Sequence, residues 1–146
     1  FFDKKLLLKY IEWIKKTQKR YGKNIHYSYE NIINYKKKLL EKNFYFEIFL
    51  LMTKNNQILA SLTIFGDKNY INEYEVNYSL INNKLNFSLH DILRDKAIKF
   101  AINNDIKFYD FSGFNPSPNV NTKDYNITFS KSKFNGKKVE FSLINT

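Results

Sequence analysis

The N-terminal part of the chain carries apolar side chains at helical spacing. Between residues 3 and 21 they recur every three or four positions, which predicts an amphipathic helix. Asp3 stands where an N-cap belongs, and Gly22 follows the last periodic residue, so these two residues mark the ends of the helix. The same spacing returns over residues 28–42 and predicts a second helix.

The pattern then changes to that of β-strands. Residues 44–52 are aromatic, β-branched and apolar on both faces, which favours a central strand of a sheet. A polar turn leads into residues 58–65, and we expect these two strands to form a hairpin. Alternation over residues 74–81 predicts a third strand with one buried and one polar face. The predicted buried face carries Tyr74, Val76, Tyr78 and Leu80, and the polar face carries Glu75, Asn77 and Ser79.

The second half of the chain continues with a helix and a further strand. Residues 88–102 have a continuous apolar stripe, and Ser88 with Asp91 three positions later forms a start that resembles a capping box. Residues 107–114 predict a strand, and residues 115–126 predict a loop because they are rich in proline and asparagine. A short helix and a final strand over residues 137–144 complete the predicted elements.

The order of these elements predicts the α/β (α+β) class and one domain over residues 1–146. Three strands joined by hairpins and followed by a crossover helix give a mixed, mainly antiparallel sheet flanked by helices. A chain of 146 residues is long enough for one core of this kind. The predicted topology is that of the GNAT acyltransferase superfamily, although a fold does not by itself determine a function.

Composition excludes several kinds of chemistry. The chain has no cysteine, which rules out disulfides, thiolate zinc sites and a cysteine nucleophile, and fits a reducing, cytoplasmic location. His26 and His90 are not paired at metal-ligand spacing, so we expect no metal site. The apolar runs are far shorter than the roughly 20 residues that span a bilayer, so we expect no transmembrane segment.

The formal charge of +10 points to an anionic partner such as nucleic acid. However, the dominant residues Lys, Asn, Ile, Phe and Tyr can all be encoded by A and T alone, and an AT-rich genome would supply much of the lysine. We favour that compositional origin and expect no DNA partner. Motifs typical of RNA-binding modules are not visible in the sequence.

Two short segments resemble a known enzyme group. The sequences YDFSG at residues 109–113 and SKSKFNG at residues 130–136 resemble the D-F/L-G-G and F-K-x-x-F-G-G patterns of the FemAB/FemX peptidyltransferases and of related GNAT-like domains in surface-polysaccharide enzymes. The resemblance implies a GNAT-like fold and transfer of an acyl group from aminoacyl-tRNA to an amine of a cell-wall or glycan precursor. FemAB enzymes have two such domains, and this chain is similar to the second, so the resemblance leaves open an additional upstream domain, a homodimer or a reused fold.

The same resemblance implies a role for Lys131, which aligns with the lysine of the F-K pair. Ser130 stands where the family has phenylalanine, and Asn135 replaces the first glycine, as asparagine tolerates the left-handed backbone of such a turn. A cation near the reacting carbonyl would stabilise its developing negative charge by about 3 to 4 kcal/mol. Lys131 would do this or hold a tRNA phosphate. The alternative is a solvent-facing lysine.

Further candidate residues follow from the motifs and the polar row of the third strand. Asp110 and Glu75 are candidates to accept the proton of the amine, although Asp110 would also serve to hold its loop by hydrogen bonds. The candidate substrate contacts are Tyr78, Ser112, Asn115 and Phe134, with a core position as the alternative for Tyr78. His90 is interpreted as a surface or capping residue.

The donor is expected to be aminoacyl-tRNA rather than acetyl-CoA, with no tightly bound cofactor. Ordinary GNAT acetyltransferases bind the coenzyme A pyrophosphate through a glycine-rich loop before the main helix. Residues 81–91 contain no glycine here, and Asp91 occupies the positive helix end that would receive the anion. An acetyl-CoA-dependent acetyltransferase is the second hypothesis, and a non-catalytic module that binds RNA or an anionic glycan is the third.

Overall fold

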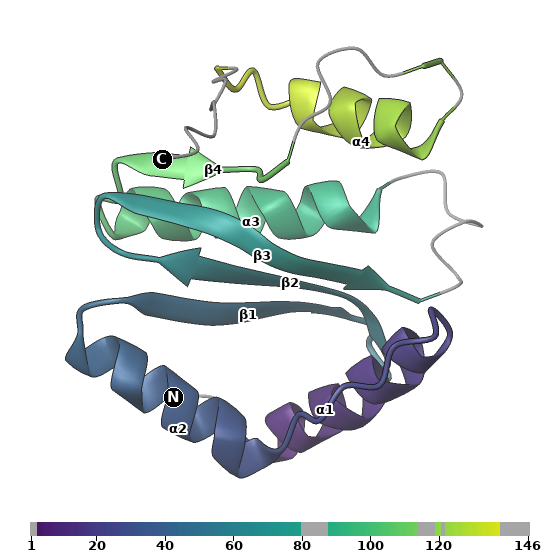
Figure 1. Cartoon of the computed structure of the whole chain (residues 1–146), viewed down its shortest axis with the longest axis vertical. Helices are drawn as coiled ribbons and strands as arrows, with labels where there is room; N and C mark the ends of the chain where they lie inside the picture. Colours follow the sequence, from purple (N-terminus) through teal and green to yellow (C-terminus); the bar gives the residue numbers. More distant parts are fainter. Residues whose placement is uncertain (1–2, 80–87, 114–118, 121, 138–146) are drawn as a thin grey trace, which may run out of the picture. The chain divides into compact units, whose positions relative to one another are not determined.

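The computed structural model describes residues 3–79, 88–113, 119–120 and 122–137 (Figure 1). The chain divides into two compact units, Phe1–Ser112 and Gly113–Thr146. The first unit contains the helices α1 to α3 and the whole described sheet, and the second contains α4. Each unit is described by itself below.

Two capped helices open the first unit, as predicted. Helix α1 spans Lys4–Lys19, and the Asp3 carboxylate accepts a hydrogen bond of 2.7 Å from the Leu6 backbone N–H. Helix α2 spans Tyr29–Glu41, and the Ser28 hydroxyl accepts one of 3.1 Å from the Asn31 N–H. Such caps satisfy N–H groups that have no partner within a helix, which fixes where each helix begins.

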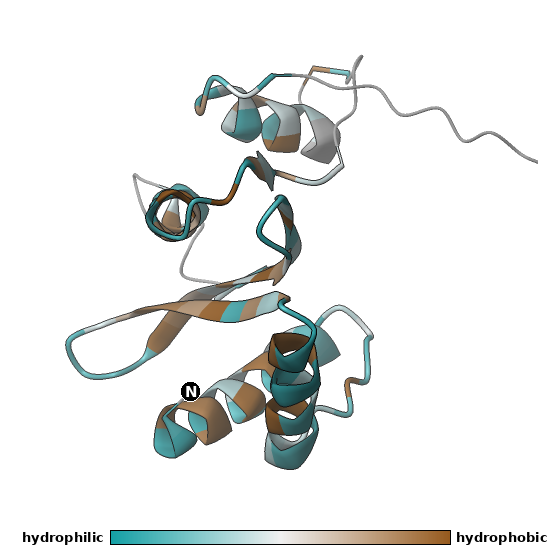
Figure 2. Ribbon diagram, turned by 90° about the vertical axis from the view of Figure 1, so that its left-hand side faces the viewer, coloured by the Kyte–Doolittle hydropathy of each residue, from teal (hydrophilic) through white to brown (hydrophobic). Residues whose placement is uncertain are grey.

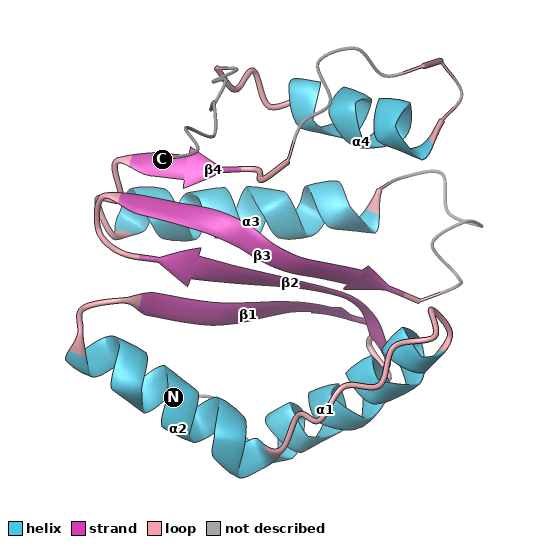
Figure 3. Cartoon of the chain, viewed as in Figure 1, coloured by secondary structure: helices cyan, strands magenta, loops and turns pink. Residues whose placement is uncertain are grey.

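The sheet is mixed, with strand order β1-β2-β3-β4 (Figure 3). Strands β1 (Tyr45–Met52), β2 (Ile58–Gly66) and β3 (Tyr70–Tyr78) form the predicted antiparallel meander. Helix α3 (Leu89–Asn103) then connects to β4 (Phe108–Asp110), which pairs with β3 in parallel. The α/β class and the mixed, mainly antiparallel sheet are therefore confirmed.

Among the strands that the structure describes, β1 lies at an edge of the sheet, so the prediction of a central position was wrong there. It is apolar on both faces because helices cover both sides of the sheet, with α3 on one side and α1 with α2 on the other (Figure 2). Tyr45 and Phe49 pack into the core on the α3 side, whereas Phe46 and Ile48 pack into the core under α1 and α2. Burial on two faces explains the sequence pattern without a second neighbouring strand.

Strand β3 begins at Tyr70 rather than at residue 74, and the predicted assignment of its faces was wrong. Tyr74 is 65% exposed and Tyr78 is 37% exposed, although both were expected to be buried. Glu73 and Asn77, in contrast, are 6% and 5% exposed. A simple alternation of buried and exposed positions therefore does not describe this strand.

The reason is a β-bulge between β2 and β3. Thr63 pairs with Glu75 and the next residue, Ile64, pairs with Glu73, so Tyr74 is an extra residue on β3. An extra residue breaks the two-residue period of a strand. Odd-numbered residues before Tyr74 and odd-numbered residues after it therefore face opposite sides of the sheet, and the same holds for even-numbered residues.

Strand β4 is shorter than the predicted strand over residues 107–114. It ends at Asp110, and Ser112 has a φ of 57°, which is outside the extended region. Helix α3 agrees with its prediction, since the Ser88 hydroxyl accepts a hydrogen bond of 3.2 Å from the Asp91 N–H.

In the second unit, helix α4 spans Lys123–Ser132 and confirms the predicted short helix. Its first residues belong to the segment 115–126 that was predicted as a loop, because the Thr122 hydroxyl caps the helix through the Tyr125 N–H at 3.2 Å. Asn135 has a φ of 55°, the left-handed backbone expected there. The predicted strand over residues 137–144 lies outside the described residues except for its first position. In the described part of the chain, the helices are all too short or too polar to cross a membrane.

Candidate functional site

A pocket of about 290 Å³ lies in the first unit between the sheet and the two N-terminal helices. Its walls come from α1, the α1–α2 connection, α2 and the first three strands. The polar and aromatic side chains that line it are Tyr10, His26, Tyr27, Asn31, Tyr35, Phe46, Thr63, Tyr74 and Glu75. The pocket therefore combines aromatic walls with one carboxylate, that of the predicted proton acceptor Glu75.

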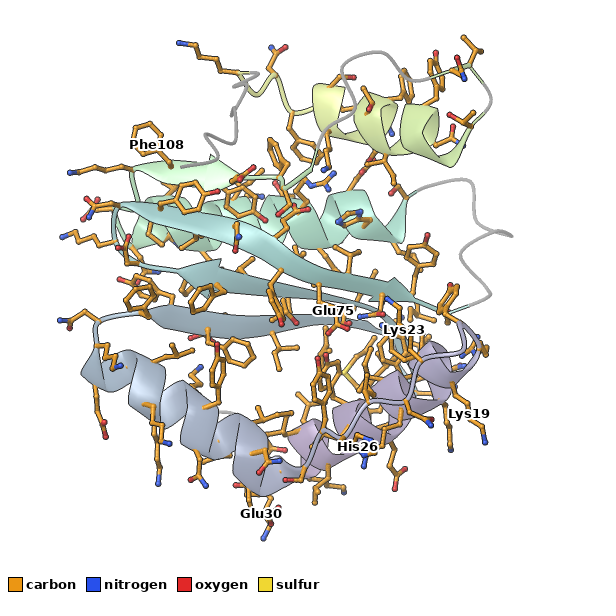
Figure 4. The ribbon with its side chains drawn as sticks, viewed as in Figure 1. Lys19, Lys23, His26, Glu30, Glu75 and Phe108 are labelled. Atoms are coloured by element: carbon orange, nitrogen blue, oxygen red, sulfur yellow. The ribbon has the colours of Figure 1, made fainter. Side chains whose placement is uncertain are left out.

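Glu75 is held at the pocket by α1 and by the α1–α2 connection. Its Oε1 accepts a hydrogen bond of 3.1 Å from the Gln18 amide, and the Tyr27 hydroxyl lies 3.5 Å from its Oε2. The Gln18 amide also donates to Asn77 Oδ1 at 2.6 Å, which ties α1 to β3 beside Glu75. Figure 4 shows Glu75 and His26 on the same side of the sheet, in agreement with their shared place in the pocket wall.

Two of the tyrosines that line the pocket have a raised pKa. Burial and the nearby Glu75 carboxylate raise the pKa of Tyr27 to about 12. The same two causes raise the pKa of Tyr10 above its ordinary value of 10.0. A neutral phenol keeps an electron-rich ring face and a hydroxyl that can donate. The formal negative charge of the pocket lining is thus that of Glu75.

The described strands carry three glutamates, and two of them have a cationic partner. Both carboxylate oxygens of Glu47 accept a hydrogen bond from the Lys36 ammonium, at 2.7 and 2.8 Å. Glu73 forms a two-point ion pair with Arg94, at 2.6 and 2.8 Å. Among the described residues, no lysine or arginine forms an ion pair with Glu75. In the described part of the chain, the hydrogen-bond partners of Glu75 are the neutral side chains of Gln18 and Tyr27.

A second polar cluster lies on the opposite face of the sheet, and the sequence analysis missed it. Arg94 on α3 is fully buried, and its guanidinium packs 5.1 Å from the centre of the Phe111 ring. His90 Nε2 lies 3.5 Å from Glu73, and the Tyr109 hydroxyl donates to Glu73 at 3.1 Å. His90 is therefore part of a buried network and not a surface or capping residue. The available signal was the spacing of four between His90 and Arg94, which places both on one helix face.

The network controls the ionisation of its own members. Burial raises the pKa of Glu73, but hydrogen bonds from Arg94 and His90 outweigh it and hold that pKa below its ordinary value. Burial and the adjacent Glu73 carboxylate raise the pKa of Tyr109. The cluster joins β3, α3 and β4, and its buried charges, those of Glu73 and Arg94, neutralise each other. These properties indicate a structural role.

Asp110 and Ser112 hold the end of β4. Asp110 Oδ1 accepts a hydrogen bond of 2.8 Å from the Ser112 N–H, and the Tyr70 hydroxyl donates to Asp110 Oδ2. The Ser112 hydroxyl donates to the Glu73 carbonyl oxygen. These bonds agree with a loop-holding role for Asp110, while its catalytic role and the substrate contact of Ser112 stay predictions.

The remaining predicted residues belong to other parts of the described chain or lie outside the described residues. Tyr78, at the end of β3, is 37% exposed, so the alternative of a core position was wrong. Lys131 and Phe134 belong to the second unit, where the Lys131 ammonium donates to the Gly113 carbonyl and the Phe134 N–H to the Lys131 carbonyl at 3.2 Å. Asn115 lies outside the described residues.

No protein-family model matches the chain, and no curated protein matches it. Within the described part of the chain, no three histidine or acidic side chains come together as a metal site. Function is therefore inferred from the residues themselves and from the geometry of the Glu75 pocket.

Proposed function

We propose that the chain is a GNAT-like N-acyltransferase of the FemAB type, which moves an aminoacyl or other acyl group onto an amine of a cell-wall or surface-glycan precursor. The observation that carries this proposal is Glu75, which lines a pocket between the sheet and the N-terminal helices and forms no ion pair with a lysine or arginine of the described residues. The order of two helices, three antiparallel strands, a helix and a parallel strand supports the GNAT-like fold. The bulge beside Glu75 adds support, because bulges often lie next to active sites.

The proposed reaction needs a proton acceptor beside the acceptor amine. An amine bound in the pocket gives a proton to the Glu75 carboxylate and attacks the carbonyl carbon of an ester or thioester with its lone pair. The carbonyl electrons move to oxygen, and a cation or N–H group stabilises the resulting oxyanion. Collapse of this intermediate breaks the ester or thioester bond and forms the amide, and the departing oxygen or sulfur takes the proton from Glu75, so that an alcohol or thiol leaves and the carboxylate is restored. The sequence resemblance alone assigns the stabilisation of the oxyanion, or the binding of a donor phosphate, to Lys131 of the second unit.

Aminoacyl-tRNA is the proposed donor, and acetyl-CoA is the second candidate. The resemblance of residues 109–113 and 130–136 to the FemAB patterns supports aminoacyl-tRNA as the donor. The glycine-free segment over residues 81–91 argues against close approach of a coenzyme pyrophosphate. Under this proposal the protein works on precursors made in the cytoplasm.

The test measures donor binding and transfer on the same sample. Charged tRNA and acetyl-CoA are titrated separately, and each is then incubated with the protein and a peptide precursor that carries a primary amine. We expect tRNA binding that weakens with salt and an amide product that disappears in Glu75→Gln. Binding and turnover of acetyl-CoA would instead establish the second hypothesis. Salt-sensitive RNA binding without transfer from either donor would favour the non-catalytic module and contradict the proposal.

A further inference from the structure

We propose that Gln18 is a positioning residue of the proposed reaction: its side-chain amide holds Oε1 of Glu75, so that Oε2 takes the proton of the amine and returns it to the leaving group. The chemical part of this inference rests on the proposed function. The hydrogen bond on which it depends belongs to the fold and can be measured without a substrate. Gln18 is not among the residues that line the pocket, so it acts through Glu75 and not on the substrate.

Gln18 stands on a rigid part of the fold, the last turn of α1. Its backbone carbonyl accepts hydrogen bonds from the N–H groups of Tyr21 at 2.9 Å and Lys23 at 3.1 Å, which close the end of the helix. Its side chain belongs to the buried face of α1, and only 7% of the residue is exposed. A donor fixed on a helix holds its acceptor more precisely than a donor on a loop does.

The Gln18 amide has two acceptors on β3. Its Nε2 lies 3.1 Å from Oε1 of Glu75 and 2.6 Å from Oδ1 of Asn77. An amide nitrogen carries two N–H donors, so each acceptor takes one of them. The reverse orientation of the amide would place the Gln18 carbonyl oxygen against both acceptors and would repel the ionised carboxylate. The carboxylate of Glu75 therefore fixes the orientation of Gln18, and Gln18 in turn holds Glu75.

The two oxygens of Glu75 have different surroundings. Oε1 accepts from Gln18, which lies outside the pocket lining. Oε2 lies 3.5 Å from the hydroxyl of Tyr27, and Tyr27 lines the pocket. A contact of that length is weak, so the lone pairs of Oε2 stay available to a proton. A proton acceptor has to lie within about 2.6 to 3.2 Å of its donor, and a carboxylate held at one oxygen keeps the other within that reach.

Asn77 provides an independent observation. It is 5% exposed, and among the described residues no group accepts a hydrogen bond from its Nδ2. A buried donor without a partner reduces stability. Turning the Asn77 amide would direct this nitrogen at the Gln18 nitrogen and break the bond of 2.6 Å. The chain therefore keeps an unpaired donor where the Gln18 amide is held, and such local losses are typical of functional sites.

The first experiment measures the hydrogen bond without a substrate. The glutamines of the chain are Gln18 and the exposed Gln57, so selective isotope labelling of glutamine gives one side-chain amide signal pair from each. Hydrogen exchange of these N–H protons is followed by NMR. We expect the Gln18 protons to exchange at least about tenfold more slowly than those of Gln57. Glu75→Ala should accelerate the exchange of one Gln18 proton several-fold and leave the proton bonded to Asn77 protected.

The second experiment measures acyl transfer. Gln18→Met removes the donor but keeps a side chain of similar length, and it should lower kcat about tenfold with KM changed less than about twofold. Thr17→Ala is the matched control, because Thr17 is 1% exposed, lies on the same buried face of α1 and is not part of the pocket lining. It should lower the melting temperature and leave kcat within about twofold. Asn77→Ala, which frees the amide from its second acceptor, should lower kcat several-fold and is the test if Gln18→Met does not fold.

The inference and the proposed function fail in different ways. Exchange at Gln18 as fast as at Gln57, or unchanged exchange in Glu75→Ala, would overturn the inference whatever the activity. Wild-type kcat in Gln18→Met, or an equal loss of kcat in Thr17→Ala, would support an acyltransferase and contradict a positioning role for Gln18. A wild type that transfers from neither donor would contradict the proposed function and the chemical part of the inference, and protection lost in Glu75→Ala would then support the hydrogen bond alone.

Discussion

Glu73 and Glu75 are two residues apart on strand β3, yet their carboxylates lie on opposite faces of the sheet. Glu73 bonds to Arg94 of α3, and Glu75 accepts from Gln18 of α1. In a regular strand the two side chains would point to the same side. The bulge at Tyr74 separates them, so that one carboxylate completes a buried ion pair and the other lines a pocket.

The buried Glu73–Arg94 pair should be essential for stability. Glu73→Gln leaves the guanidinium of Arg94, which is 0% exposed, without its main partner. Breaking a buried pair in this way costs about 3 to 5 kcal/mol. Chemical denaturation at pH 7 measures the free energy of unfolding, and Glu12→Gln, on the exposed face of α1, provides the control with almost no expected change. A loss below about 1 kcal/mol in Glu73→Gln would contradict this role.

The same pair should make stability depend on pH in the acid range. The folded-state pKa of Glu73 lies below its ordinary value of 4.5, because the hydrogen bonds from Arg94 and His90 outweigh the effect of burial. The unfolded chain therefore binds the proton first as the pH falls. The stability that the pair provides is complete above pH 4.5, the ordinary pKa, and is lost as the pH falls through the lower folded-state pKa of Glu73. We expect the stability difference between wild type and Glu73→Gln to narrow as pH falls below about 4.5. A difference that stays constant down to acid unfolding would contradict the pKa direction.

At the alkaline end, stability should fall as the pH rises above 10. Burial and the adjacent Glu73 carboxylate raise the pKa of Tyr109 above its ordinary value of 10.0, and burial with Glu75 raises that of Tyr27 to about 12. Unfolded tyrosines release their protons first, so the folded state binds more protons in this range and loses stability. Denaturant midpoints between pH 8 and 11 test this, and Tyr109→Phe should flatten the decline. An equally steep decline in that variant would assign the effect to other groups.

Gly66 should not tolerate a side chain. A Cβ at this residue would lie 2.1 Å from the Tyr70 carbonyl oxygen and 2.6 Å from the Ile71 Cα, and the φ of 152° is also unfavourable. Because the obstructing atoms belong to the backbone, Gly66→Ala should lose about 3 kcal/mol or more. Gly22→Ala is the matched control, since Gly22 has a φ of 71° but no atom within 4 Å of the added Cβ, and should lose about 1 to 2 kcal/mol. Equal melting temperatures of the two variants would contradict the steric account.

Lys131→Ala should reduce the rate of acyl transfer about 10²- to 10³-fold if the ammonium stabilises the oxyanion. Lys133→Ala removes a neighbouring charge whose ammonium lies 5.5 Å from the centre of the Phe129 ring, and should change the rate less than twofold. Initial rates with the donor found to be active provide the comparison, and melting temperatures show whether both variants fold. Full activity of Lys131→Ala would remove Lys131 from the mechanism.

Asp110→Asn distinguishes a loop-holding residue from a proton acceptor. Asparagine keeps one acceptor oxygen, so the loop should lose about 1 to 2 kcal/mol of stability and the transfer rate should change only a few-fold. If Asp110 accepted the proton instead, the rate would fall at least about 10²-fold with little change in melting temperature. The pair of measurements therefore assigns the role of Asp110 independently of Glu75.

The helices and the approximate strands could be predicted because their determinants are local. Asp3 and Ser88 each cap a helix at the position that the sequence indicates, and the second helix begins directly after Ser28, where its predicted range starts. The left-handed Asn135 was also predictable, because backbone preference belongs to the residue itself. Glu75 was recognised as a candidate from its place in a polar row, although the pocket around it was not visible in the sequence.

By itself, the sequence determined where the chain becomes helical or extended and which chemical groups it carries. The tertiary structure alone decided that β1 lies at an edge among the described strands, that Arg94 and His90 are buried against Glu73, and that Glu75 faces the N-terminal helices. These features depend on pairing between distant segments. The bulge at Tyr74 arises from the register between β2 and β3, and a shift of one residue moves every following side chain to the other face. No local pattern in β3 contains that information.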